Sequence, residues 1–67
     1  MSVAKVTEIS ASSPVGFEDA VKQGIARAGK TLTNIKGAWI SEQKVDVEDG
    51  KVTTYRVMMK VSFVLED

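Results

Sequence analysis

The side chains best suited to chemistry in this 67-residue sequence are one tryptophan, a few basic groups and scattered carboxylates. Histidine and cysteine are both absent. Their absence removes the commonest general base, thiol nucleophiles and the side chains that most often bind transition metals. The sequence also has no glycine-rich phosphate loop and no pair of carboxylates set in an evident cleft. These features predict that the protein is not an enzyme.

The basic groups and the tryptophan belong to a predicted hairpin that runs from Ile35 to Leu65. Asp49-Gly50 separates two runs of alternating hydrophobicity, and this dipeptide favours a two-residue type I′ turn. A constant register from that turn would pair Trp39 with Lys60 and Gln43 with Arg56. All four would then lie on the sheet face opposite an apolar stripe formed by Tyr55, Val57, Met59, Val61, Phe63 and Leu65.

The face that carries Trp39 is therefore predicted to be either a ligand site or a subunit interface. Arg56 and Lys60 would favour an anionic ligand, such as the phosphate of a nucleotide-like cofactor. Alternatively, Trp39 is an interface aromatic that covers Lys60 by a cation–π contact, and the protein is a purely structural assembly module.

A first strand and a helix are predicted before the hairpin. Residues Val3 to Ala11 have apolar side chains on both faces of a strand, and Phe17 to Leu32 have the three- and four-residue spacing of an amphipathic helix. Gly24 inside this helix predicts close approach to the sheet. The predicted fold is α+β, with β-α-β-β order and a three-stranded antiparallel sheet wrapped on one helix, which packs in part against Ala38 and Ile40.

Length and charge suggest how the chain exists in the cell. Residues 1–67 are expected to form a single domain near the lower size limit for an independent core, so we expect homo-oligomerisation. Nine basic and nine acidic residues balance, so no nucleic-acid partner is expected. The sequence has no membrane-length apolar run or signal-peptide pattern. We therefore expect a soluble cytoplasmic protein with no membrane partner.

The order and spacing of several short motifs resemble the dodecins, small bacterial and archaeal proteins, over nearly the whole chain. These motifs are Glu8-Ile9, Ser12-Ser13-Pro14, Phe17-Glu18-Asp19-Ala20-Val21, Asn34-Ile35, Val47-Glu48-Asp49-Gly50-Lys51-Val52, Tyr55 and Lys60-Val61. The resemblance implies a hollow homododecamer that stores small ligands. Typical dodecins bind flavins such as FMN or riboflavin by stacking them on a tryptophan and hydrogen-bonding them to a glutamine.

Both flavin-binding positions of the family are changed in this sequence. The family tryptophan follows an isoleucine-basic pair, where Gly37 stands here, and the family glutamine follows the aromatic residue of the last strand, where Arg56 stands here. The resemblance therefore implies a degenerate flavin site. A flavin could still be bound if Trp39 stacks on it from a displaced position.

Dodecin relatives that share both substitutions are linked to calcium binding, so the resemblance favours a calcium-type dodecin. Calcium prefers six to eight oxygen ligands, which carboxylates supply. The candidate ligands are Asp46, Glu48 and Asp49, with Glu8, Glu18, Glu66 and Asp67 as further carboxylates. None has EF-hand spacing, so the site would be shared between loops or subunits.

Overall fold

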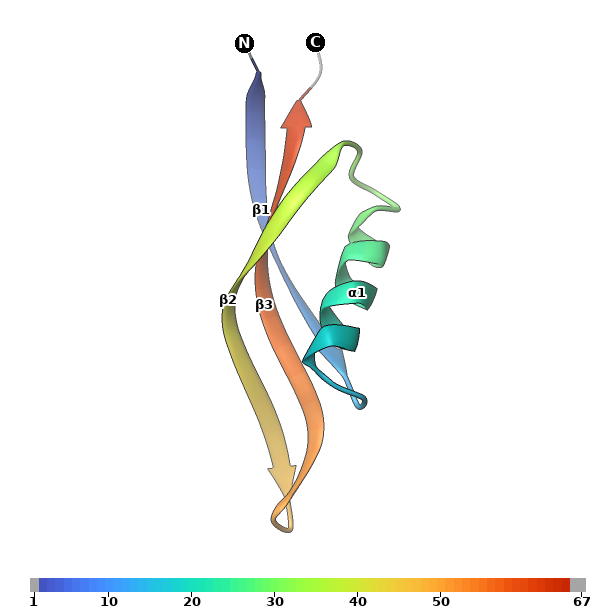
Figure 1. The fold of residues 1–67 in the computed structure, drawn as a ribbon, viewed down its shortest axis with the longest axis vertical. Helices are drawn as coiled ribbons and strands as arrows, with labels where there is room; N and C mark the ends of the chain where they lie inside the picture. The colour runs from blue at the N-terminus through green and yellow to red at the C-terminus, as the bar shows by residue number, and fades with distance from the viewer. Residues whose placement is uncertain (1, 66–67) are drawn as a thin grey trace.

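The computed structural model describes residues 2–65 of the chain. Within this range the elements are β1 (Val3–Ser13), α1 (Phe17–Ala28), β2 (Ile35–Glu48) and β3 (Lys51–Leu65). All strand pairs are antiparallel, and the strand order β1-β3-β2 places β3 in the centre of the sheet (Figure 1). This arrangement confirms the predicted β-α-β-β fold.

The core lies between α1 and the neighbouring strands β1 and β3. Ala20, Val57 and Met59 are fully buried there, and partly buried apolar side chains of α1 and β1 pack around them. Gly24 lets the helix approach closely, because a Cβ atom at this position would lie 2.6 Å from Met59 Cε and 2.9 Å from Ala11 Cβ. The close approach predicted for Gly24 is therefore confirmed.

The helix covers the sheet only in part. It packs against β1 and β3, whereas the predicted contacts with Ala38 and Ile40 of β2 are not made to any depth, since both residues are exposed. This part of the prediction was wrong because the chain order does not reveal that β3, and not β2, lies next to β1. The helix side of β2 is left without a cover.

The helix is also shorter than predicted and ends at Ala28 instead of Leu32. After Ala28 the backbone tightens, with Lys30 N donating to Arg27 O and Thr31 N donating to Ala28 O, both at 3.1 Å. The apolar spacing continues through this turn because it reports which side a residue faces, not whether its backbone is helical. β1 differs in the opposite sense and extends two residues beyond its predicted end, to Ser13.

The hairpin turn is formed as predicted, but its register is not constant. Asp49 and Gly50 have φ angles of 52° and 75°, as a type I′ turn requires. Register shifts then occur between Asp46 and Val47 and between Ile40 and Glu42. Between these two shifts every residue of β2 pairs one position away from the constant-register prediction. From Ile40 to Gly37 the first register returns, so that Trp39 pairs with Lys60 as predicted, and a third shift follows between Gly37 and Ile35.

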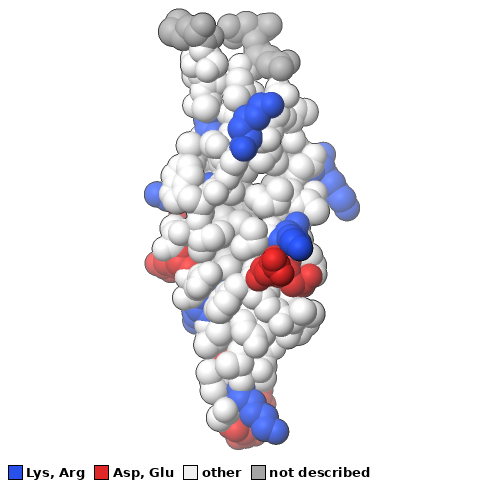
Figure 2. All heavy atoms as spheres, in the orientation of Figure 1, with Lys and Arg blue, Asp and Glu red and all other residues white. Residues whose placement is uncertain are grey.

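The described residues form an elongated body with extents of 52 × 19 × 13 Å. Figure 2 shows acidic and basic side chains interspersed along the face in view, without a block of either sign. No helix in the described part of the chain is long and apolar enough to cross a membrane.

Candidate functional site

The candidate site lies on the outer face, by which we mean the sheet face opposite α1. Directly paired residues of antiparallel strands project to the same face. Lys60 of β3 therefore shares the outer face with both of its partners, Glu8 of β1 and Trp39 of β2. The sheet thus assembles a row of one carboxylate, one ammonium group and one indole. The prediction that Trp39 and Lys60 lie together is confirmed.

Trp39 and Gly37 lie on the outer face of an edge strand. Trp39 is half exposed, with 50% of its surface accessible. Gly37 pairs with Ser62, whose Oγ donates to Gly37 O at 3.2 Å. A Cβ atom at Gly37 would meet only Ser62 Oγ, at an ordinary contact distance of 3.8 Å. A side chain could therefore be accommodated at position 37. Because glycine has none, the backbone of β2 beside Trp39 is not covered by a side chain from this position within one subunit.

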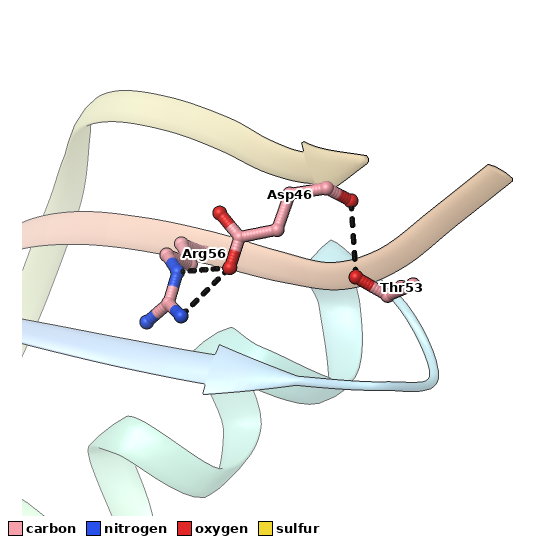
Figure 3. Close-up of polar contacts among 3 residues, drawn as sticks. All are labelled: Asp46, Thr53 and Arg56. Atoms are coloured by element: carbon pink, nitrogen blue, oxygen red, sulfur yellow. Dashed lines mark hydrogen bonds and ion pairs between the residues drawn. The ribbon is translucent and has the colours of Figure 1, made fainter. Parts of the chain in front are cut away.

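Arg56 is held by an ion pair with Asp46 on the outer face (Figure 3). Arg56 Nε and Nη2 donate to the same carboxylate oxygen, Asp46 Oδ2, at 2.9 and 2.7 Å. Thr53, at the first register shift, donates from Oγ1 to Asp46 O at 3.3 Å. The hydrogen bond from Arg56 lowers the pKa of Asp46 from its ordinary value and raises the pKa of Arg56. The arginine thus has a counter-ion within its own subunit.

Gln43 does not belong to this face, and its predicted placement was wrong. The register shift at the turn end of β2 pairs Gln43 with Val57, on the helix side, and brings Lys44 opposite Arg56 instead. The same shift pairs Glu42 with Met58, on the outer face, whereas a constant register would have placed it on the helix side. Alternation of side chains cannot reveal such shifts, because an inserted residue reverses the faces of all residues beyond it.

The residues that the register shifts bring together surround a small hollow on the outer face. Its volume is about 210 Å³, and Glu42, Lys44 and Arg56 supply its charges, with Ser10 and Met58 beside them. Lys44 and Glu42 are the residues that sequence reasoning missed. The sequence gives no signal that would have placed them, because Trp39 pairs with Lys60 whether or not two compensating shifts lie between it and the turn.

The predicted metal ligands are dispersed within one subunit. Asp46 is engaged by Arg56, Glu48 pairs with Lys51 next to the turn, and Asp49 lies in the turn itself. Between residues 2 and 65, no three acidic side chains are close enough to one another to hold a metal ion. Glu66 and Asp67 lie outside the described residues. A calcium site that uses Asp46, Glu48 and Asp49 stays a prediction that requires further ligands from another subunit.

Comparisons of the sequence and of the fold with known proteins find the same family. The family model for dodecin matches residues 3–66, which is nearly the whole chain. The chain belongs to the dodecin family. Among curated dodecins, the calcium dodecin of Mycobacterium tuberculosis is 36% identical over 94% of this chain and 89% of its own length. The dodecin of Thermus thermophilus is 32% identical over 97% of this chain and 94% of its own length.

Solved dodecin structures superpose along the whole subunit. The dodecin from Streptomyces davaonensis has a TM-score of 0.93 at 35% identity, covering 98% of this chain and 97% of that one. The structure of the M. tuberculosis calcium dodecin, described as a calcium-chelating antigen with a novel calcium-binding site, has a TM-score of 0.82 at 35% identity. It covers 96% of this chain and 91% of that one. The similarity therefore extends over β1, α1 and the complete hairpin.

Proposed function

We propose that this dodecin is a non-catalytic binding and storage protein that self-associates into a hollow homododecamer, with a degenerate flavin site and calcium as its ligand. The observation that carries the proposal is the pair of changed positions, Gly37 and Arg56. Gly37 offers no ring for stacking, and Arg56 offers only donors where a flavin edge needs a donor and an acceptor. The similarity to a protein named calcium dodecin supports calcium as the replacement ligand.

The electrostatics of Arg56 support a site that no longer suits a flavin. Its guanidinium group is fixed by Asp46 through two hydrogen bonds, so a flavin edge would have to approach an ion pair already formed. The paired carboxylate oxygen of Asp46 is occupied as well. We therefore expect calcium to bind mainly through Glu48 and Asp49 together with carboxylates of neighbouring subunits, with Asp46 as a secondary ligand.

A flavin titration tests the first part of the proposal. Riboflavin or FMN fluorescence should remain unquenched when the assembled wild-type protein is added. The double variant Gly37→Trp/Arg56→Gln restores both family residues, and the open space at Gly37 admits the ring. We expect saturable quenching by this variant. Strong quenching by the wild-type protein, lost in Trp39→Ala, would instead show the displaced flavin site.

A calcium titration by calorimetry tests the second part. Asp49→Asn removes a carboxylate and keeps the turn, because asparagine tolerates a positive φ angle as well as aspartate. We expect this variant and Glu48→Gln to bind calcium at least 10-fold more weakly, as each loses one charged oxygen ligand. Glu42→Gln, which changes an exposed carboxylate of β2 that is not a candidate ligand, is the matched control. Equal heats of calcium binding for the wild-type protein and all three variants would refute the assignment of the calcium site to the turn end of the hairpin.

A flavin-binding function through Trp39 is the second candidate. It is favoured by the half-exposed indole, which lies on the same face as Gly37 and is paired with the cation of Lys60. An aromatic, anionic ligand would suit this combination, with the ring on Trp39 and the negative charge near Lys60 and Arg56. The variant Trp39→Ala distinguishes flavin binding from a purely structural role. Loss of the assembly in light scattering would indicate that Trp39 lies in a subunit interface. Loss of flavin affinity with an intact assembly would indicate that Trp39 lies in a binding site.

A further inference from the structure

The hollow on the outer face owes its charged lining to the two register shifts between the turn and Trp39. A constant register would have turned Gln43 to this face, whereas the segment between the shifts presents Glu42 and Lys44 instead. The two shifts cancel, so Trp39 pairs with Lys60 as it would in a regular hairpin. Their effect is thus confined to the side chains around the hollow. Irregularities of this kind re-aim side chains beside functional sites in many sheets.

Both shifts are held by side-chain hydrogen bonds. Ser41, the unpaired residue of β2 at one shift, donates from Oγ to Met58 O at 3.2 Å. Thr53, the unpaired residue of β3 at the other shift, donates from Oγ1 to Asp46 O at 3.3 Å. In each case the extra residue carries a hydroxyl group that binds a carbonyl oxygen of the opposite strand. The shifted segment is therefore a defined part of the hairpin.

The charges around the hollow balance one another, and two of them have no partner in the described part of the chain. Arg56 donates from Nε and Nη2 to Asp46 Oδ2, which leaves Nη1 outside this ion pair (Figure 3). Glu42 and Lys44 also line the hollow, and neither forms an ion pair within residues 2–65. An anion alone would lie near two carboxylates, and a cation alone would lie near two basic groups. The charges therefore suit a ligand that carries both signs.

The size and the apolar surface of the hollow restrict the ligand further. Its volume of about 210 Å³ is below the ~300–1,000 Å³ of pockets that enclose drug-sized ligands and cofactors. A flavin or a nucleotide is therefore too large to be enclosed. Met58, which is half-buried, supplies apolar surface from the central strand, and Ser10 lines the hollow from β1. Methionine adapts its shape to different apolar partners.

We propose that the hollow is a binding site for a small zwitterion, namely a free amino acid with an apolar side chain. Its α-carboxylate accepts from Lys44 Nζ and Arg56 Nη1, its α-ammonium group donates to Glu42, and its side chain contacts Met58. These contacts lie within one subunit and include none of the candidate calcium ligands. The inference goes beyond the proposed function and does not depend on it.

The single tryptophan of the sequence provides a reporter, because Trp39 pairs with Lys60, the next outer-face residue of β3 after Met58. The wild-type protein is titrated, in the presence of a calcium chelator, with L-leucine and two blocked forms of it. N-acetyl-L-leucine lacks the ammonium group, and L-leucinamide lacks the carboxylate. Binding is followed by Trp39 fluorescence and by calorimetry. We expect L-leucine to bind about 10-fold more tightly than either blocked form, because each has lost one charged contact.

Two variants test the assigned contacts. Glu42→Gln should weaken the binding of L-leucine by about 10-fold, but not that of N-acetyl-L-leucine, which has no ammonium group for Glu42 to bind. Lys44→Gln should weaken the binding of L-leucine, but not that of L-leucinamide, which has no carboxylate for Lys44 to bind. Glu18→Gln and Lys22→Gln on the exposed helix surface are the matched controls and should bind L-leucine as the wild-type protein does.

The absence of saturable L-leucine binding in calorimetry would overturn the proposal. Equal affinities for L-leucine and N-acetyl-L-leucine would indicate a site for anions, and equal affinities for L-leucine and L-leucinamide a site for cations; either result would overturn it as well. Wild-type affinity for L-leucine in both Glu42→Gln and Lys44→Gln would place the bound amino acid elsewhere on the protein. None of these results bears on calcium binding, since the chelator removes the ion.

Discussion

At the scale of single residues, the outer face carries an ion pair between the neighbouring strands β2 and β3. Arg56 forms its hydrogen bonds with Asp46, two residues before the turn end of β2. Glycine at position 37 lies in an ordered strand, since Ser62 Oγ donates to its carbonyl oxygen at 3.2 Å. Under the function proposed above, these two positions on different strands change what the face can bind, while the backbone stays that of a dodecin.

The ion pair predicts a pH dependence of stability that Asp46→Asn should remove. Because Arg56 lowers the pKa of Asp46, the folded state binds the proton more weakly than the unfolded chain. The contribution is present at neutral pH and is lost as the pH falls below 3.8, through the lowered pKa. We expect wild-type and variant urea midpoints to differ slightly at pH 6 and to converge near pH ~2.

Salt provides the control for this prediction, since both partners are exposed to solvent. The difference between wild-type protein and Asp46→Asn at pH 6 should shrink in ~1 M salt, where exposed charges are screened over about 3 Å. A difference that persists unchanged at low pH and in high salt would mean that Asp46 acts through the packing of the hairpin and not through its charge.

At the scale of elements, β2 and α1 determine what the faces of the sheet carry. Two of the three register shifts in the hairpin, those at Asp46/Val47 and Ile40/Glu42, exchange the faces of the residues between them, which brings Glu42 and Lys44 to the outer face and Gln43 to the helix side. The helix is brought close to β1 and β3 by Gly24. The exchange of faces comes from the backbone pairing of β2 with β3, and the close approach of α1 comes from the missing side chain of Gly24. Neither effect depends on a charged group.

The contact at Gly24 predicts that alanine, the better helix former, will destabilise the protein. Alanine would gain about 1 kcal/mol in helix propensity, but its Cβ would lie 2.9 Å from Ala11 Cβ. Overpacking of this kind costs about 1–3 kcal/mol. We expect Gly24→Ala to lower the free energy of unfolding in urea titrations. Ala11→Gly removes the opposing atom, so the double variant should recover part of the loss in a double-mutant cycle.

At the scale of the whole molecule, one subunit is a long, thin body whose helix covers only two of the three strands in the described range. Apolar side chains remain exposed at the termini end (Val3, Leu65), along β2 (Ile40, Val45) and near the turn (Val47, Val52). Exposed apolar surface of this extent marks interaction sites in soluble proteins. The shape therefore suits a building block for an assembly.

Coupling between folding and assembly predicts a melting temperature that depends on protein concentration. A 100-fold increase in concentration stabilises an assembled subunit by about 2.7 kcal/mol, which corresponds to a rise in Tm on the order of 10 °C for so small a chain. Calorimetry over this concentration range measures the shift. Ile40→Asp should reduce it by weakening assembly, and a wild-type Tm that is constant over the range would contradict coupled folding.

The sequence by itself determined the order of the elements, the type I′ turn and the close approach at Gly24, whereas the predicted pairing of Trp39 with Lys60 was right only because the two register shifts before Trp39 cancel. These features follow from local chemistry: side-chain periodicity, the φ preferences of Asp49-Gly50, and the missing side chain of Gly24. Only the tertiary structure decided the central place of β3, the end of α1 at Ala28, and the faces of Glu42, Gln43 and Lys44. Strand order and register shifts arise from pairing between distant segments, so no local pattern in the chain specifies them.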